Sequence, residues 1–99
     1  MTSMLWSVEV FLTEEPESTR ADAVLEVGDR KFRGYGQARR NPVDPDVPRI
    51  GEELATARAL SDLSHQLLHA AASAIEAFEG QHVKVGGSFG GVGGWETQG

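Results

Sequence analysis

Residues 21–39, ADAVLEVGDRKFRGYGQAR, contain the pattern that decides the fold. Apolar and polar side chains alternate on both sides of Gly28-Asp29, which is the pattern of two half-buried strands. A Gly-Asp pair between two such runs favours a tight reversal of the chain. The stretch therefore predicts an antiparallel hairpin with strands over residues 21–27 and 32–39.

The second strand of this hairpin has small residues on one face, namely Gly34, Gly36 and Ala38. Glycine weakens a strand unless another element approaches the backbone closely. The three positions predict a helix that lies almost on the strand, and this packing explanation needs no ligand.

A first strand is predicted upstream, over residues 6–13, because Trp6, Val8, Val10 and Leu12 alternate with the other side chains. The acidic run around Pro16 then suits a turn. Downstream of the hairpin, residues 41–48 contain three prolines at a spacing of three. They predict a stiff, extended connector, and a ligand for a proline-recognition domain is the alternative.

A long helix is predicted over residues 51–78, where apolar and small residues recur at steps of three and four. Glu52 and Glu53 would lie in its first turn, and Gly80 would end it. The predicted stripe comprises Ile50, Leu54, Ala57, Ser61, Ser64, Leu68, Ala71, Ile75 and Phe78, widened by Leu60, Leu63 and Leu67.

The length of this helix predicts a homodimer. About 28 residues span roughly 42 Å, whereas an eight-residue strand spans about 27 Å. The overhanging turns would carry four candidate dimer or packing residues, which a second chain or the folded-back tail could cover. These residues are Leu68, Ala71, Ile75 and Phe78.

The predicted fold class is α+β: a three-stranded antiparallel meander packed on one long C-terminal helix. We expect a single domain over residues 1–79 and a flexible Gly-rich tail over residues 80–99, which hold eight of the twelve glycines. Phe89 and Trp95 in the tail are candidate docking residues, and disorder is the alternative.

Composition excludes several classes of protein. The chain has 99 residues, a net charge of −6 and no cysteine, so disulfide scaffolds and thiolate metal sites are excluded. No apolar run reaches the roughly 20 residues of a membrane span, and no secretory signal is visible. We therefore expect a cytoplasmic protein with no membrane partner and no evident small-molecule substrate.

The segment Gly34–Leu63 carries a family resemblance. Its motifs are Gly-Tyr-Gly-Gln-Ala-Arg from Gly34, Pro-Val-Asp from Pro42, and Val-Pro-Arg-Ile-Gly-Glu-Glu-Leu-Ala from Val47, followed by Ala-Arg-Ala-Leu-Ser-Asp-Leu from Ala57. Over about residues 6–79 the chain resembles the DUF1876 family of small bacterial proteins. Glu52 is a departure, since that family usually has Asp after the glycine.

The resemblance implies a β-β-β-α unit with a double-stranded-RNA-binding-domain-like (dsRBD-like) fold that lacks the first helix. It also implies dimerisation, likeness to ribosome hibernation factors, and an association with stress or dormancy. It brings no catalytic residues. In a true double-stranded-RNA-binding domain a Lys cluster starts the last helix, whereas this chain has Gly51-Glu52-Glu53, which would repel phosphate. Duplex RNA is therefore not the expected ligand.

One face of the strand over residues 32–39 is the main candidate site. A basic stripe with a central aromatic ring can bind single-stranded RNA by phosphate contact and base stacking. Two alternatives remain: the stripe is neutralised by Glu9, Asp22 and Glu26, or the face is a subunit interface that includes Leu5, Phe11 and Val24. The stripe consists of Lys31, Arg33, Tyr35, Gln37 and Arg39.

Other motifs give weaker signals. His65 and His69 have the i, i+4 spacing of a zinc site, but Gln66 stands where a zinc hydrolase needs Glu, so surface histidines are the preferred interpretation. Arg58 and Asp62 have the spacing of a helix-surface ion pair. No nucleophile with a His/Asp partner and no phosphate loop is visible, so we expect no enzyme, metal or cofactor.

The sequence thus predicts a non-enzymatic, stress- or dormancy-associated protein, with the ribosome or RNA as candidate partner through the basic stripe. The alternative is a homodimeric protein-interaction module that docks through its sheet face or tail and binds no nucleic acid.

Overall fold

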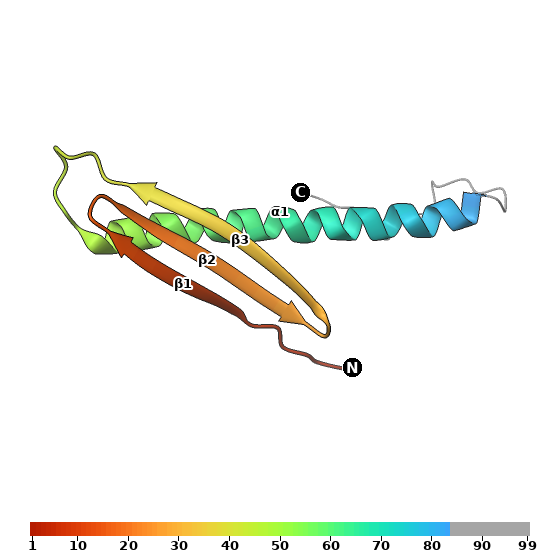
Figure 1. The fold of residues 1–99 in the computed structure, drawn as a ribbon. Coiled ribbons are helices and arrows are strands. Elements are labelled where there is room, and N and C mark those ends of the chain that lie inside the picture. The colour runs from red at the N-terminus through yellow and green to blue at the C-terminus, as the bar shows by residue number, and fades with distance from the viewer. Residues whose placement is uncertain (84–99) are drawn as a thin grey trace. The chain divides into compact units, whose positions relative to one another are not determined.

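The computed structural model describes the backbone of residues 1–83 and the side chains of residues 1–80. Its elements are β1 (Val8–Glu15), β2 (Ser18–Val27), β3 (Arg30–Arg39) and α1 (Pro48–Val83) (Figure 1). The three strands form one antiparallel sheet in the order β1-β2-β3, as predicted. The fold is therefore α+β, and Phe89 and Trp95 lie outside the described residues.

Two tight turns fix the register of the sheet. Glu15 pairs with Ser18, and Val27 pairs with Arg30, so each hairpin loop has two residues. Gly28 has a φ of 61°, which glycine adopts without strain and which the hairpin turns that match the strand twist have at this position. The predicted bounds of β1 lie two residues too early, and the predicted β2 and β3 are too short. The reason is that alternation of apolar and polar residues does not show that strand pairing continues up to the turns.

The core lies between the small residues of β3 and a line of residues on α1. A Cβ added at Gly34 would meet the backbone of Ala59 and Leu63, and one at Gly36 would meet the backbone of Ala55 and Ala59. Ala55, Ala59 and Leu63 are at most 3 % exposed. The helix thus lies almost on the strand, as the glycines predict.

The predicted stripe on the helix was wrong in its first half. Ile50, Leu54 and Leu60 are 52 %, 45 % and 42 % exposed, and Ala57 is also exposed. The close approach to β3 admits alanine rather than larger side chains, so Ala55 and Ala59 occupy the buried line.

β1 is the least buried strand. Trp6, Val8 and Leu12, which were predicted as its apolar pattern, are 54 %, 42 % and 45 % exposed. By contrast, Ala21, Ala23 and Leu25 of β2 are at most 2 % exposed. The apolar side chains of β1 are therefore largely uncovered.

Both ends of the helix differ from the prediction. α1 begins at Pro48, so Glu52 and Glu53 lie beyond its first turn. Proline is tolerated at this position because the N–H groups of the first turn have no hydrogen-bond partner within the helix. Its backbone continues through Gly80 to Val83. Gly80 has open space around its Cα and is accommodated within the helix.

The proline-containing connector is folded into a turn rather than extended. Asp44 donates a backbone hydrogen bond to the carbonyl of Asn41 (2.8 Å), and Val43 donates one to the Asn41 side chain (3.2 Å). Arg40 donates to the carbonyls of Pro42 and Asp44 at 3.4 and 3.0 Å. Asn41 and Arg40 therefore determine the path of the connector.

The described chain divides into two compact units, with the boundary between Gln66 and Leu67. The first contains the sheet and, among residues 1–80, every buried side chain. In the second, Leu68 is 41 % exposed, Phe78 is 60 % exposed, Ala71 is exposed and Ile75 is half-buried. Within the described residues, no helix is apolar over a length that could span a membrane.

Candidate binding face of the sheet

The register places the five stripe residues on the outer face of the sheet, opposite the buried small residues. Tyr35 pairs with Asp22 and Gln37 with Arg20, so the side chains of these β2 residues share that face. Phe11 of β1, which is 55 % exposed, pairs with Asp22 and lies on it as well. The outer face is therefore a mixed surface with a central aromatic ring.

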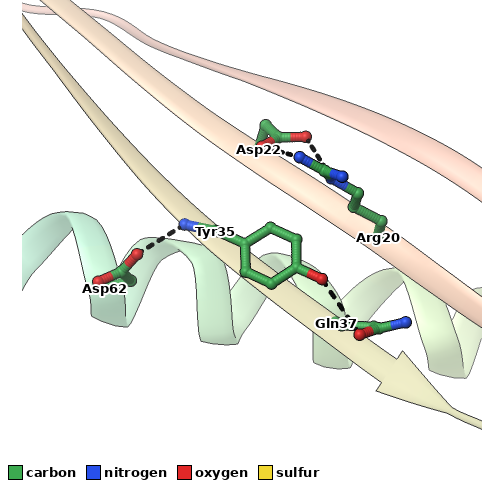
Figure 2. Close-up of polar contacts among 5 residues, drawn as sticks. All are labelled: Arg20, Asp22, Tyr35, Gln37 and Asp62. Atoms are coloured by element: carbon green, nitrogen blue, oxygen red, sulfur yellow. Dashed lines mark hydrogen bonds and ion pairs between the residues drawn. The ribbon is translucent and has the colours of Figure 1, made fainter.

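Tyr35 lies at the centre of a small polar network (Figure 2). The Arg20 guanidinium lies 4.8 Å from the centroid of the Tyr35 ring and forms an ion pair with Asp22 (Nε–Oδ2 3.1 Å). The Tyr35 hydroxyl donates to Oε1 of Gln37 at 3.1 Å. The hydrogen bond to Asp22, together with its charge, raises the pKa of Arg20 above its ordinary value, so Arg20 stays charged.

Arg20 is a member of this face that the sequence pattern missed. The alternation within β3 is enough to predict the stripe. Arg20 lies on β2, and its place beside the stripe follows only from the register between β2 and β3. The length of the hairpin loop was the signal available, because a two-residue turn after Val27 places Arg20 opposite Gln37.

Neutralisation of the stripe is partial. Lys31 pairs with Glu26 at 3.8 Å, and Arg20 pairs with Asp22. Among residues 1–80, no ion pair involves Arg33 or Arg39, although both side chains are exposed. Two free guanidinium groups therefore remain, on residues about 20 Å apart along β3.

Two side chains of α1 bind the outer edge of β3. Asp62 Oδ2 accepts a hydrogen bond from the Tyr35 backbone N–H at 2.8 Å, and Arg58 Nη1 donates to the Gln37 carbonyl at 2.8 Å (Figure 2 shows Asp62). No Arg58–Asp62 ion pair occurs in the part of the chain that the structure describes, so the expected helix-surface pair is wrong. The helix instead caps an edge strand.

His65 and His69 belong to no cluster of metal-ligating residues among the described side chains. Within the described side chains, no three His, Cys, Asp or Glu residues are grouped to hold a metal ion. Asp62, one turn before His65, uses its carboxylate on the Tyr35 backbone.

A cleft of about 320 Å³ lies where the β1–β2 turn, the connector and the start of α1 meet. Acidic side chains line much of it, including Glu14 and Asp46. A hydrogen bond that the protonated Glu14 carboxyl donates to Glu52, with some desolvation, raises the pKa of Glu14 above its ordinary value. Carboxylates this close repel each other and disfavour an anionic ligand.

Comparison with known proteins places this architecture in a family. The model of the Rv2632c-like family matches residues 4–84. The chain belongs to the Rv2632c-like family. That match covers all three strands and α1 and ends before most of the Gly-rich tail.

Relatives in mycobacteria support the assignment. The uncharacterised protein Rv2632c of Mycobacterium tuberculosis is 47 % identical over 76 residues, which cover 77 % of this chain and 82 % of that protein. The uncharacterised protein Mb1767 of Mycobacterium bovis is 41 % identical over 80 residues, covering 81 % and 85 %. The crystal structure of Rv2632c is similar with a TM-score of 0.73 and 44 % identity, covering 78 % of this chain and 92 % of that one.

Proposed function

We propose that this Rv2632c-like protein is a non-enzymatic, cytoplasmic protein that binds single-stranded RNA through the outer face of β3. The observation that carries the proposal is the pair of free guanidinium groups, Arg33 and Arg39, on either side of the exposed Tyr35 ring. The ribosome of a stressed or dormant cell is the proposed source of the RNA. The resemblance to the dsRBD-like fold supports this setting.

The chemistry of the face suits a single strand rather than a duplex. Guanidinium groups bind phosphate, and an aromatic ring offers a stacking surface for an unpaired base. Tyr35 is 45 % exposed, and Arg20 lies against its ring without covering it. Because the rest of the chain is acidic, affinity would depend on this row of residues rather than on overall charge.

The test is binding of a fluorescent single-stranded RNA, measured by anisotropy over a range of salt concentrations. The double variant Arg33→Glu plus Arg39→Glu should weaken binding strongly. Loss of two phosphate contacts should also reduce the slope of log K against log salt by about 1.4. Tyr35→Leu should weaken binding with little change in that slope, because it removes stacking only.

A matched control is Arg30→Glu plus Arg49→Glu, which makes the same change of net charge away from the outer face. Arg30 lies over the Phe32 ring, and Arg49 pairs with Glu53 on α1. This control should retain most of the affinity. Equal loss in both double variants would mean that net charge alone governs binding, and unchanged binding in the outer-face variant would reject the proposal.

A second candidate function is a homodimeric protein-interaction module. The exposed apolar side chains on both faces of β1 favour it, since isolated apolar patches of this kind often mark protein contacts. Co-purification from a stationary-phase lysate with and without RNase separates the two candidates. A partner lost with RNase favours RNA, and one retained favours protein contact.

A further inference from the structure

The two edges of the sheet differ in how they are protected. At the β3 edge, Asp62 and Arg58 already bind the Tyr35 N–H and the Gln37 carbonyl. At the β1 edge, Val8, Val10, Leu12 and Glu14 direct their backbone groups away from β2. This follows from the two-residue turn, because Glu15 must exchange hydrogen bonds with Ser18 and the direction then alternates along β1.

The side chains of β1 protect this edge only through the charges of Glu9, Glu14 and Glu15. The strand reads VEVFLTEE, without proline, lysine or a bulge, which are the other usual devices against edge pairing. Apolar groups flank the edge on both faces: Val8 and Leu12 on one, at 42 % and 45 % exposed, and Phe11 on the other, at 55 %. An open ladder with apolar flanks is a template for another strand.

We propose that the occupant of this edge is β1 of a second copy, paired antiparallel around a two-fold axis at Phe11. This assignment specifies the contact of the homodimer proposed above and rests on it, but it does not depend on RNA binding. The result would be one continuous sheet of six strands, three from each copy.

The charges of β1 select this register. With Phe11 opposite the partner's Phe11, Glu9 faces the partner's Thr13 and Glu14 faces the partner's Val8. No acid then faces an acid, and the two phenyl rings form an aromatic cross-strand pair. Val10 and the partner's Leu12 exchange backbone hydrogen bonds, because both direct these groups outward.

Neighbouring registers are less favourable. Moving the axis to Leu12 places Glu9 opposite the partner's Glu15 on both sides of the axis, and like charges directly opposite are destabilising. Moving the axis to Val10 leaves Phe11 opposite the partner's Glu9 and pairs fewer residues of the strand. A shift of the pairing register by one residue is also unfavourable. It would place the outward-facing N–H and C=O groups of one β1 opposite residues of the partner's β1 whose N–H and C=O groups are already hydrogen-bonded to β2.

Disulfide trapping tests this register cleanly, because the chain has no cysteine of its own. Phe11→Cys should form a covalent dimer under mild oxidation, since unbonded antiparallel pairs bring Cα atoms to about 4.5 Å. Thr13→Cys alone should not, because the two sulfurs would be about 14 Å apart along the strands. A mixture of Glu9→Cys and Thr13→Cys should form the mixed dimer and retains Phe11.

A second variant tests the backbone contact. Val10→Pro removes an N–H that faces outward, so pairing of β1 with β2 should survive and the far-ultraviolet circular dichroism should be unchanged. Dimerisation measured by analytical ultracentrifugation should weaken at least about tenfold.

The outcomes separate the two proposals. A dimeric protein that is not trapped at Phe11→Cys or in the mixed pair, and that tolerates Val10→Pro, would reject edge pairing and leave the homodimer standing. Trapping at Leu68→Cys in place of Phe11→Cys would assign the dimer to α1 instead. A chain that stays monomeric at high concentration would reject both.

Discussion

Gly34 and Gly36 show how single residues determine this fold. Alanine at either position would place a Cβ against helix backbone, which cannot move aside as a flexible side chain can. We expect Gly34→Ala and Gly36→Ala each to lower the free energy of unfolding by about 3 kcal/mol, measured by urea denaturation.

Gly80→Ala is the matched control for the glycine variants. Nothing lies within 4 Å of a Cβ at that position, and alanine is the better helix former. Its stability should be unchanged or raised by at most about 1 kcal/mol. Tolerance of alanine at Gly34 would mean that the helix does not lie on β3 as closely as described.

Asp62 is the second residue whose role is local and testable. Its carboxylate accepts the Tyr35 N–H, which lies at the outer edge of the sheet that the described residues form. Asp62→Ala should lower the free energy of unfolding by about 1–2 kcal/mol and accelerate hydrogen exchange of the Tyr35 amide. Asp62→Asn keeps an acceptor oxygen and should lose less. Equal exchange of the Tyr35 amide in Asp62→Ala and wild type would contradict the cap.

At the scale of elements, the contact between β1 and the start of α1 predicts a dependence on pH. A hydrogen bond that the protonated Glu14 carboxyl donates to Glu52 is the main cause of the raised pKa of Glu14. A carboxyl whose pKa is raised on folding favours the folded state while protonated, and that contribution is lost as the pH rises through the folded pKa. At neutral pH the two carboxylates therefore oppose folding.

Glu52→Gln should consequently raise the melting temperature at pH 7. The gain should disappear at about pH 3, where Glu14 is protonated and the repulsion between two charged carboxylates is absent. Glu53→Gln is the control, because Glu53 is exposed and pairs with Arg49, so its removal should bring no gain at pH 7. A gain from Glu52→Gln that persists at low pH would refute charge repulsion as its cause.

Elements also show which parts of the fold can be predicted from sequence. Alternation and the Gly-Asp turn correctly predict the meander, and Gly34 and Gly36 correctly predict a close helix. The buried line of Ala55 and Ala59 was missed, because a hydrophobic pattern ranks leucine above alanine, whereas close packing on glycine selects the smaller side chain. Arg20 and the role of Asp62 depend on tertiary register, which local periodicity does not contain.

For the molecule as a whole, burial is unevenly distributed along the chain. Every buried side chain among residues 1–80 lies between Thr19 and Leu63. The helical residues 67–80 belong to a separate unit, and none of their side chains is buried. Stability of the monomer should therefore reside mainly in the first unit.

Hydrogen exchange measured residue by residue tests this division. Amides of Ala55–Leu63 should exchange only through global unfolding, whereas those of Leu68–Phe78 should open at a much lower free energy, because no side chain of residues 67–80 is buried and burial supplies most of the stability of a helix. Repeating the measurement on Val10→Pro separates folding from association. If Leu68–Phe78 were as protected as Ala55–Leu63 in the dimer and lost that protection on dilution, a second chain would cover α1. Protection that stays low at every concentration agrees with a dimer joined through β1, because the residues that make that contact all belong to the sheet.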